Sequence, residues 1–131
     1  MIENVFRWVE IYVQDMERAK QFYEEVFQVT LERLQTPSVV QEVDEAAELF
    51  AFPMSSMGPG AGGALVKIKG VPSSGSGTIA YFGSRDCLVE QGRIVAAGGS
   101  IHRPKSAIAP YGFIVLANDT EGNLFGIHSM E

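Results

Sequence analysis

The sequence predicts an α+β fold in which two βαβββ modules form a cupped, partly open mixed sheet with the helices outside. Three observations support this prediction. Each half of the chain has the pattern strand, helix, strand, strand, strand. A chain of 131 residues suits one domain whose two small halves share a core, and the Gly- and Ser-rich residues 70–77 have the composition of a linker. We therefore place module 1 at about residues 1–69 and module 2 at about residues 78–131.

The first half begins with a predicted strand at residues 5–13, which is rich in β-branched and aromatic side chains. Asp15 is the predicted N-cap of the following helix, because its carboxylate can accept from the free backbone amides of the first turn. We then expect strands at residues 29–34, 49–54 and 63–69, with a loop over residues 36–48. The helix carries an apolar stripe at three- and four-residue spacing, formed by Met16, Ala19, Phe22, Tyr23, Val26 and Phe27.

The second half repeats this order without repeating the residues. Residues 78–83 read as a strand, and Asp86 is the predicted N-cap of a helix that runs to about Ala97. Gly98 is the expected stop signal for that helix. The remaining strands are predicted at residues 100–104, 112–118 and 123–129.

Composition excludes several classes of function. The net charge of -6 argues against a nucleic-acid groove and against docking on an anionic membrane, since both need clustered Lys and Arg. No apolar run reaches transmembrane length and the first residues lack the pattern of a signal peptide, so we expect a cytoplasmic protein. Cys87 is the single cysteine, which rules out an intramolecular disulfide and a cysteine-based zinc cluster. We expect Cys87 to be an ordinary helix residue.

Side chains alternate along a strand, so each predicted strand divides into two sets. Val9, Ile11 and Val13 suit packing against the first helix, and we expect Ile79, Tyr81, Phe125 and Ile127 to face helices as well. The concavity would then receive Trp8, Glu10, Tyr12, Thr78, Phe82, Leu124 and His128. Phe50 and Phe52 are either further stacking surfaces for a flat ligand or ordinary core residues. This mixed lining predicts a pocket for a small, partly apolar molecule.

Two stretches of the chain resemble a known family. The segment "VEIYVQDMERAKQFYEEVFQV" and the terminal "YGFIVLANDTEGNLFGIHS" resemble the opening and the final turn and strand of the glyoxalase/bleomycin-resistance/extradiol-dioxygenase family, also called the vicinal oxygen chelate superfamily. Thr120 stands where that family commonly has proline, and Gln28 where it commonly has glycine. The resemblance implies two βαβββ modules forming a cupped sheet, often in a homodimer, which agrees with the pattern of the strands.

The better-known enzymes of that family hold a divalent metal with His and Glu side chains inside the cup. The resemblance places the first ligand seven residues before Asp15, at Trp8, and the last seven residues after Asp119, at Gly126. It places the other two at Thr78 or a neighbour and within residues 62–67. None of these is a good metal donor. We therefore expect a site without a metal or other cofactor.

Three ionisable residues are candidates for chemistry. Glu10 is either an acid, base or polar anchor for a ligand, or a carboxylate at a seam that pairs with Arg7 or with backbone. His128 is either a proton carrier in the cavity or a histidine at a strand end. His102 is expected at the surface. Glu10 and the two histidines could also form a displaced metal site, although no spacing motif supports one.

These observations predict a protein that binds a small organic molecule in a metal-free cup, with catalysis left open. One alternative is a lyase, isomerase or dioxygenase-type enzyme that uses a displaced metal site or acid/base chemistry at Glu10. The other is an antibiotic-sequestering resistance protein, which the net charge of -6 permits for a cationic drug. The expected partners are the small-molecule ligand and a second copy of the chain, with no nucleic acid and no membrane.

Overall fold

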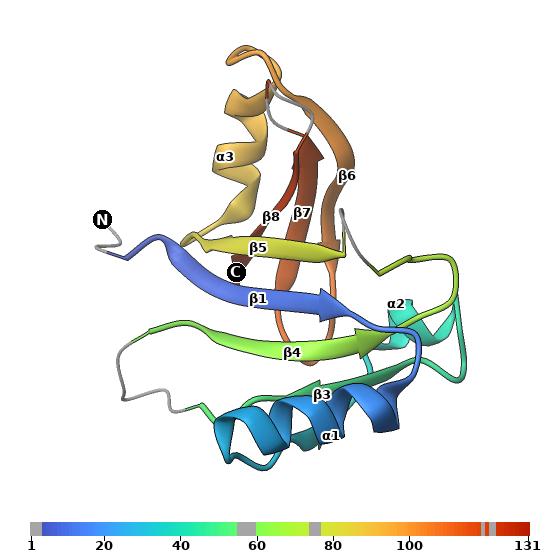
Figure 1. Cartoon of the computed structure of the whole chain (residues 1–131). Helices are drawn as coiled ribbons and strands as arrows, with labels where there is room; N and C mark the ends of the chain where they lie inside the picture. The colour runs from blue at the N-terminus through green and yellow to red at the C-terminus, as the bar shows by residue number, and fades with distance from the viewer. Residues whose placement is uncertain (1–3, 55–59, 74–76, 119, 121–122) are drawn as a thin grey trace. The chain divides into compact units, whose positions relative to one another are not determined.

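The structure is a computed structural model that describes residues 4–54, 60–73, 77–118, 120 and 123–131. Contacts between residues divide the chain into two compact units. The N-unit is Val9–Thr78, and the C-unit combines Met1–Trp8 with Ile79–Glu131. Each unit has the predicted order strand, helix and three strands, so the α+β class and the paired βαβββ pattern are confirmed (Figure 1).

The N-unit has the strand order β2-β3-β4-β1, with β2, β3 and β4 antiparallel. Its part of β1 begins at Val9, and Val13 N–H at the end of that strand donates to Val66 O at 2.9 Å. Helix α1 runs alongside β3 and β4 (Figure 1). The elements that contribute to this unit are β1 Phe6–Tyr12, α1 Met16–Phe27, β2 Glu32–Leu34, α2 Ser38–Gln41, β3 Glu48–Ala51 and β4 Gly62–Lys67.

Helix α1 begins and ends as its local sequence requires. The Asp15 side chain accepts from Arg18 N–H at 3.1 Å, which confirms the predicted N-cap. At the other end Gln28 adopts a left-handed conformation with φ 55, which stops the helix. Under α1 lies the core of the N-unit: Val13, Met16, Leu31 and Leu65, with Ile11, Ala19, Tyr23, Val29, Phe50 and Phe52 packed against it.

Two expectations about the N-unit were wrong in detail, and part of the predicted linker makes hydrogen bonds. Phe22 and Phe27 belong to the predicted apolar stripe but are 57% and 61% exposed, because they lie at its margins. The short helix α2 lies in a segment predicted as loop. Residues 71–73 fall in the predicted linker, yet the Gln14 side chain donates to Val71 O and Ser73 Oγ donates to Tyr12 O. This part of the segment is therefore held against the end of β1.

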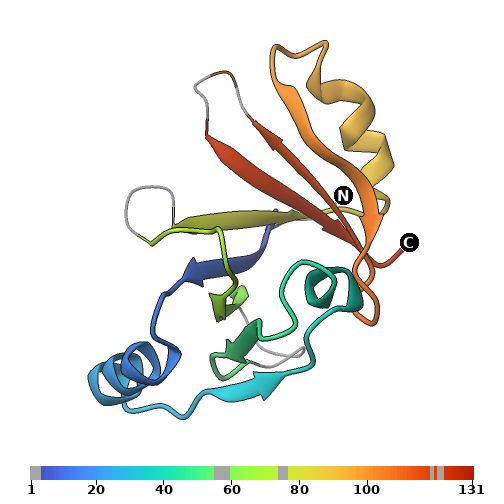
Figure 2. The ribbon, with the colours of Figure 1, turned by 90° about the vertical axis from the view of Figure 1, so that its right-hand side faces the viewer.

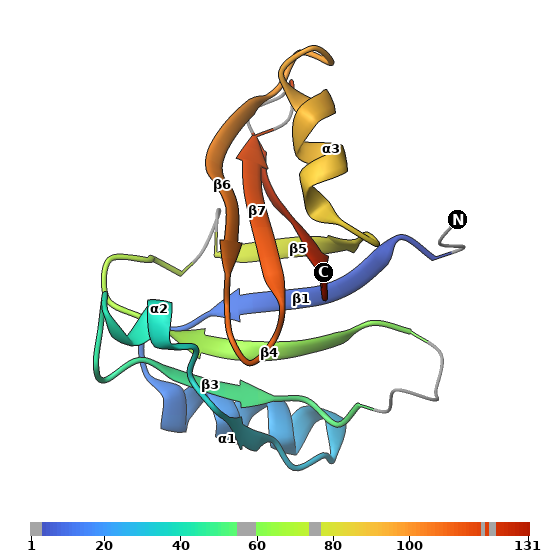
Figure 3. The same cartoon turned by 180° about the vertical axis from the view of Figure 1, so that it is seen from behind.

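The C-unit has the strand order β1-β5-β8-β7-β6, in which β5 and β8 are parallel and the β8-β7 and β7-β6 pairs are antiparallel. The first residues of β1 join it through the Gly83 N–H, which donates to Val5 O at 2.7 Å. Figure 2 shows α3 beside β6, and Figure 3 shows β6 and β7 running side by side. The remaining elements are β5 Thr78–Gly83, α3 Cys87–Ile94, β6 Ser100–Ala107, β7 Phe113–Asn118 and β8 Leu124–Ser129.

Helix α3 covers one face of these strands. Asp86 is its N-cap, as predicted, and accepts from Leu88 N–H at 3.0 Å. Cys87 is fully buried, and its N–H donates to Ser129 Oγ on β8 at 3.0 Å. The core under α3 contains Cys87, Val115 and Ile127, with Ile94, Phe113 and Phe125 packed against it, so the predicted inward placement of Phe125 and Ile127 is confirmed. Among the described residues, no helix is long and apolar enough to cross a membrane.

Candidate functional site

A hydrogen-bonded pair of side chains lies on the part of β1 that belongs to the N-unit. Tyr12 Oη donates to Glu10 Oε1 at 2.6 Å, and both residues are partly buried. Ile11 and Val13 belong to the core beneath α1. Because side chains alternate along a strand, Glu10 and Tyr12 lie on the other face of β1. Their assignment to the lining of a ligand site stays a prediction.

The bond between these two side chains defines what the pair can do chemically. A hydrogen bond from a phenol to an ionised carboxylate is shorter and stronger than one between neutral groups. It restricts the carboxylate to one orientation, so that Glu10 can anchor a ligand or accept a proton from one. The Arg7 guanidinium, which one sequence interpretation paired with Glu10, lies against Gly83 within the C-unit.

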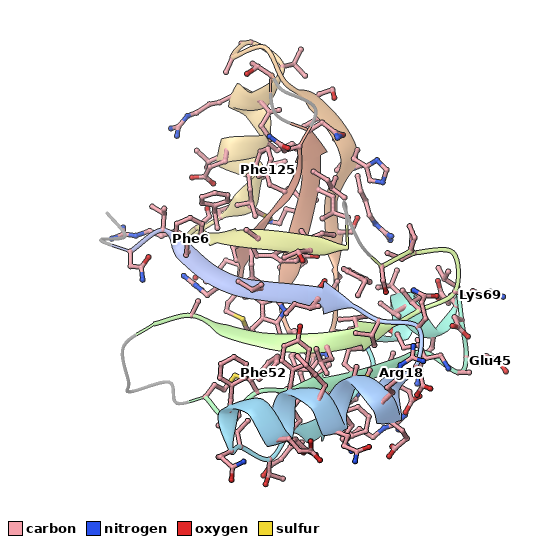
Figure 4. All side chains as sticks on the ribbon, viewed as in Figure 1. Phe6, Arg18, Glu45, Phe52, Lys69 and Phe125 are labelled. Carbon is pink, nitrogen blue, oxygen red and sulfur yellow. The ribbon has the colours of Figure 1, made fainter. Side chains whose placement is uncertain are left out.

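A shallow groove of about 560 Å³ lies in the N-unit beside the N-terminal end of α1. Figure 4 shows Arg18 at that end of the helix. The volume is within the range of small-molecule sites. The groove brings Tyr12 and Thr78 together, but Glu10 is not part of its lining, which consists of Ile11, Tyr12, Val13, Gln14, Asp15, Arg18, Ala19, Phe22, Tyr23, Ser73, Gly77 and Thr78.

Phe50 and Phe52 belong to the core and not to a ligand-stacking surface. Phe50 is paired with Leu65, which is fully buried beneath α1. The Lys20 ammonium on α1 lies 4.2 Å from the centre of the Phe50 ring. Phe52, labelled in Figure 4, meets the Tyr23 ring edge to face at 5.5 Å. Helix α1 therefore covers the side of both rings that would have to contact a ligand.

The faces predicted for β5 are reversed. Tyr81 pairs with Gly126 and Phe82 with Ile127, and paired residues in a parallel ladder have side chains on the same face. Ile127 faces α3, so Phe82 also faces α3 and Tyr81 does not. The Phe82 ring stacks on Phe6 at 5.1 Å and meets Phe125 edge to face at 5.9 Å, and Figure 4 shows the places of Phe6 and Phe125. Phe82 is therefore a packing residue.

We call the side of the C-unit strands turned away from α3 the far face. His128 lies on it, because His128 pairs with Ile114 next to the inward-facing Val115. Its Nε2 lies 2.5 Å from Tyr111 O and donates to it, since a carbonyl can only accept. Its Nδ1 is buried and has no hydrogen-bond partner in the part of the chain that the structure describes. The register places on this face Tyr81, Gly83, Ile114, Leu116, Leu124, Gly126 and His128.

The remaining predicted site residues, Trp8, Thr78, His102 and Leu124, lie at separate places in the fold. Trp8 is partly buried and is the last residue of the N-terminal segment of the C-unit. Thr78 is exposed at the start of β5. His102 is exposed on β6, as expected. Leu124 is partly buried on the far face, beside Gly126.

The residues at the family's metal positions do not fit a divalent metal. The indole of Trp8 offers only a donor hydrogen, and Gly126 has no side chain. The Tyr81 ring occupies the space that a side chain at Gly126 would need, with Tyr81 Cγ 3.0 Å from the position of an ideal Cβ. Within the described ranges, no three His, Cys, Asp or Glu side chains are grouped so that they could hold a metal ion.

Sequence reasoning missed two residues of the far face, Arg7 and Tyr81. The signal that could have found them is the glycine opposite each one. A glycine inside a strand often marks a place where another group approaches closely. Gly83 and Gly126 are such glycines, and their missing side chains leave room for the Arg7 guanidinium and for the Tyr81 ring.

Comparison with known proteins assigns the fold to a family. The chain belongs to the Glyoxalase/Bleomycin resistance protein/Dioxygenase superfamily, whose family model matches residues 5–127. No curated protein matches the chain. Among solved structures, it is similar to Streptomyces coelicolor methylmalonyl-CoA epimerase in complex with 2-nitronate-propionyl-CoA. That structure is 15% identical, with a TM-score of 0.70 and 96% of each chain covered.

Two further structures show the same likeness. A hypothetical protein from Bacillus halodurans is 12% identical with a TM-score of 0.73, covering 99% of this chain and 96% of that one. Mycobacterium tuberculosis methylmalonyl-CoA epimerase is 14% identical with a TM-score of 0.68, covering 100% of this chain and 93% of its own. At such low identity these similarities establish the fold, and the activity has to be argued from this chain's own residues.

Proposed function

We propose that this protein binds a small, partly apolar organic molecule on the face of β1 that carries Glu10 and Tyr12, and that it does so without a metal at the family's usual positions. The observation that supports the proposal is the 2.6 Å hydrogen bond from Tyr12 Oη to Glu10 Oε1. It presents an oriented carboxylate on a strand whose other face is fixed by the core under α1. A few oriented polar groups in apolar surroundings are what small-molecule sites need for specificity.

Membership of the superfamily supports a small-molecule role but leaves the ligand open, because one fold hosts many unrelated functions. The Streptomyces coelicolor epimerase was solved in complex with 2-nitronate-propionyl-CoA. Nothing in the 15% identity transfers that ligand to this chain. The residues at the family's metal positions here, Trp8, Thr78 and Gly126, support a binding mode that depends on hydrogen bonds and apolar contacts.

The proposal is tested by screening the protein against a library of small aromatic and aliphatic acids, alcohols and amides with ligand-observed NMR. Each ligand that binds is then titrated against the Glu10→Gln and Tyr12→Phe variants. We expect Glu10→Gln to weaken binding by about tenfold or more, since a hydrogen bond to a charged group contributes about 1.5–3 kcal/mol. Tyr12→Phe should weaken it less, because it leaves the carboxylate in place.

The matched control is Glu17→Gln, which removes an exposed carboxylate in the first turn of α1. This variant should bind every ligand as the wild type does. Ligands that bind Glu10→Gln and the wild type equally would refute the assignment to this face, and so would a library in which no compound binds.

Acid/base catalysis at Glu10 is the second candidate, and the same hydrogen bond supports it. A carboxylate oriented by a phenol is suited to accept a proton from a bound molecule. If a ligand from the screen exchanges a carbon-bound proton with deuterated solvent in the presence of the wild type but not of Glu10→Gln, this reading replaces simple binding. Glu10→Gln is suitable for this purpose because the amide keeps the shape of the carboxylate and cannot accept the proton.

A further inference from the structure

The far face of the C-unit contains an arginine in a place normally taken by a β-carbon. The ideal Cβ of Gly83 would stand 2.7 Å from Arg7 Nε and 2.8 Å from Arg7 Cζ. Because Gly83 pairs in parallel with His128, the space above it lies beside the His128 side chain. The guanidinium and the imidazole are therefore neighbours on one surface.

Arg7 has no carboxylate partner in the part of the chain that the structure describes. The ion pairs there are Arg33 with Glu48 and Lys105 with Asp86. Arg7 is nevertheless partly buried, and a buried charge normally requires a partner. Arg7 is thus a partly buried guanidinium beside Gly83 with no carboxylate among the described residues to neutralise it.

The charges around Arg7 strengthen this reading. Arg103 pairs with Leu116 and so lies on the far face as well, where its Nε donates to Ser106 Oγ at 3.2 Å. The paired strand positions of this face contain no Asp or Glu. In a chain with a net charge of -6, a face with two arginines and a histidine, and without an acid at its described paired strand positions, is complementary to an anion.

The histidine adds a second polar requirement. Its Nε2 hydrogen is committed to Tyr111 O, so in the neutral ring Nδ1 carries a lone pair. That atom is buried without a partner among the described residues, and an unpaired buried acceptor is unfavourable. Side-chain movements on binding would let a hydroxyl next to the anion reach this atom and donate to it. Ile114, Leu116 and Leu124 provide partly buried apolar contacts around these groups.

From this geometry we infer that the far face binds the carboxylate of a small organic acid with an apolar body and a hydroxyl beside the carboxylate. Arg7 takes the carboxylate through two parallel N–H···O bonds, which its planar fork is shaped to make. His128 Nδ1 accepts from the hydroxyl, and the apolar side chains contact the rest of the molecule. The inference rests on the proposed small-molecule function but assigns the ligand class from different residues.

The test uses three probes of nearly equal size: mandelate, phenylacetate and mandelamide. They carry the carboxylate with the hydroxyl, the carboxylate alone, and the hydroxyl with a neutral amide. Each is titrated into the wild-type protein at constant ionic strength, and the backbone amide shifts are followed by NMR. We expect mandelate to bind about fivefold more tightly than phenylacetate, because it makes one more neutral hydrogen bond. We expect it to bind about tenfold or more tightly than mandelamide, because the amide lacks the negative charge. The largest shifts should occur at Gly83, Leu116 and His128.

Variants separate the roles. Arg7→Gln should weaken mandelate by about tenfold or more, with Arg7→Lys intermediate because it keeps the charge and loses the fork. His128→Phe should remove the preference for mandelate over phenylacetate. The control is Arg93→Gln, an exposed arginine on α3, which should change nothing.

The inference fails if mandelamide binds as well as mandelate, if Arg7→Gln binds like the wild type, or if no probe saturates. The comparison among the three probes needs no variant, so misfolding of a mutant cannot hide the answer. Glu10→Gln distinguishes this inference from the proposed function. Loss of mandelate in Arg7→Gln alone supports the far face, whereas loss in Glu10→Gln alone supports only the face of β1.

Discussion

Gly126 lies directly opposite Tyr81 in the parallel pair of β5 and β8, and the tyrosine ring covers the place of a β-carbon. Tyr81 is 6% exposed, so its ring has little room to move away. We therefore predict that Gly126→Ala destabilises the protein by about 1–3 kcal/mol, the usual cost of overpacking a well-filled site. Urea denaturation monitored by circular dichroism measures this loss.

Two comparisons identify the cause. In a Tyr81→Ala background the added methyl group meets no ring, so Gly126→Ala should cost much less there. Gly92→Ala in α3 is the control, because nothing lies within 4 Å of its missing Cβ and alanine favours a helix by about 0.5–1 kcal/mol. An equal loss from Gly126→Ala in both backgrounds would contradict the explanation.

At the residue scale, the face of Glu10 on its strand could be predicted from local alternation, whereas the faces of Phe50, Phe52 and Phe82 could not. Glu10 and Tyr12 alternate with Ile11 and Val13, so the polar set of β1 shows which face avoids the core. In β3 and β5 apolar residues occur at consecutive positions. Alternation then shows that the side chains form two sets, but it does not show which set faces the helix. The hydrogen-bond register with the neighbouring strands determines which set faces the helix. The sequence of a single strand does not reveal that register.

At the element scale, the cap of α3 is also an electrostatic clamp. Asp86 accepts from Leu88 N–H, and Lys105 Nζ on β6 lies 2.8 Å from Asp86 Oδ1. The hydrogen bond from Lys105, followed by that from Leu88, holds the pKa of Asp86 below its ordinary value of 3.8. The clamp ties the start of the helix to an edge strand that otherwise pairs only with β7.

This clamp predicts a pH-dependent effect of Asp86→Asn. A carboxyl group whose pKa is lower in the folded state adds stability above its ordinary pKa, and that stability is lost as the pH falls through the folded value. Asp86→Asn should therefore be less stable than the wild type at pH 7, with a difference that narrows below about pH 4. Urea denaturation at a series of pH values measures it.

Lys105→Met provides the matched control for this prediction. It removes the ammonium and keeps an unbranched side chain over the Phe113 ring, where Lys105 Nζ lies 4.7 Å from the centre. In this background most of the pH dependence of Asp86→Asn should disappear. A difference that is constant from pH 7 to pH 3 in the wild-type background would rule the clamp out.

Elements were predicted best where local chemistry defines them. Asp15 and Asp86 are N-caps because a carboxylate beside free amides is favourable whatever the rest of the fold does. Helix α2 was missed because its four residues, Ser38–Gln41, have no side-chain cap and too few positions to show a helical period. Its existence depends on surrounding structure that a local pattern does not reveal.

At the scale of the whole molecule, the paired pattern and the two end motifs were enough to predict the family and the fold class. The two units defined by contacts do not have the same boundaries as the two βαβββ repeats of the sequence. Phe6 and Arg7 contact β5 residues across more than seventy positions of sequence, and so the first residues of β1 belong to the C-unit. Such long-range pairing leaves no local trace in the sequence.

We predict that the protein is a homodimer, as the resemblance to its family implies. Several large apolar side chains are exposed on the two longer helices, among them Phe27 at 61% and Leu88 at 53%. Exposed apolar surface of this kind is common at contacts between subunits. Size-exclusion chromatography with light scattering should give twice the 14.2 kDa of the chain, and a single-chain mass at every concentration would disprove the prediction.

The contact between Val5 and Gly83 also has a consequence for how the chain matures. Residues 5–8 are synthesised long before β5, and they have no partner strand while the N-unit is being made. The C-unit becomes complete only when this segment pairs with β5 and β8 has been added. Cleavage of the chain or a bulky fusion near Arg7 would therefore destabilise the C-unit, most of which is synthesised after the N-unit.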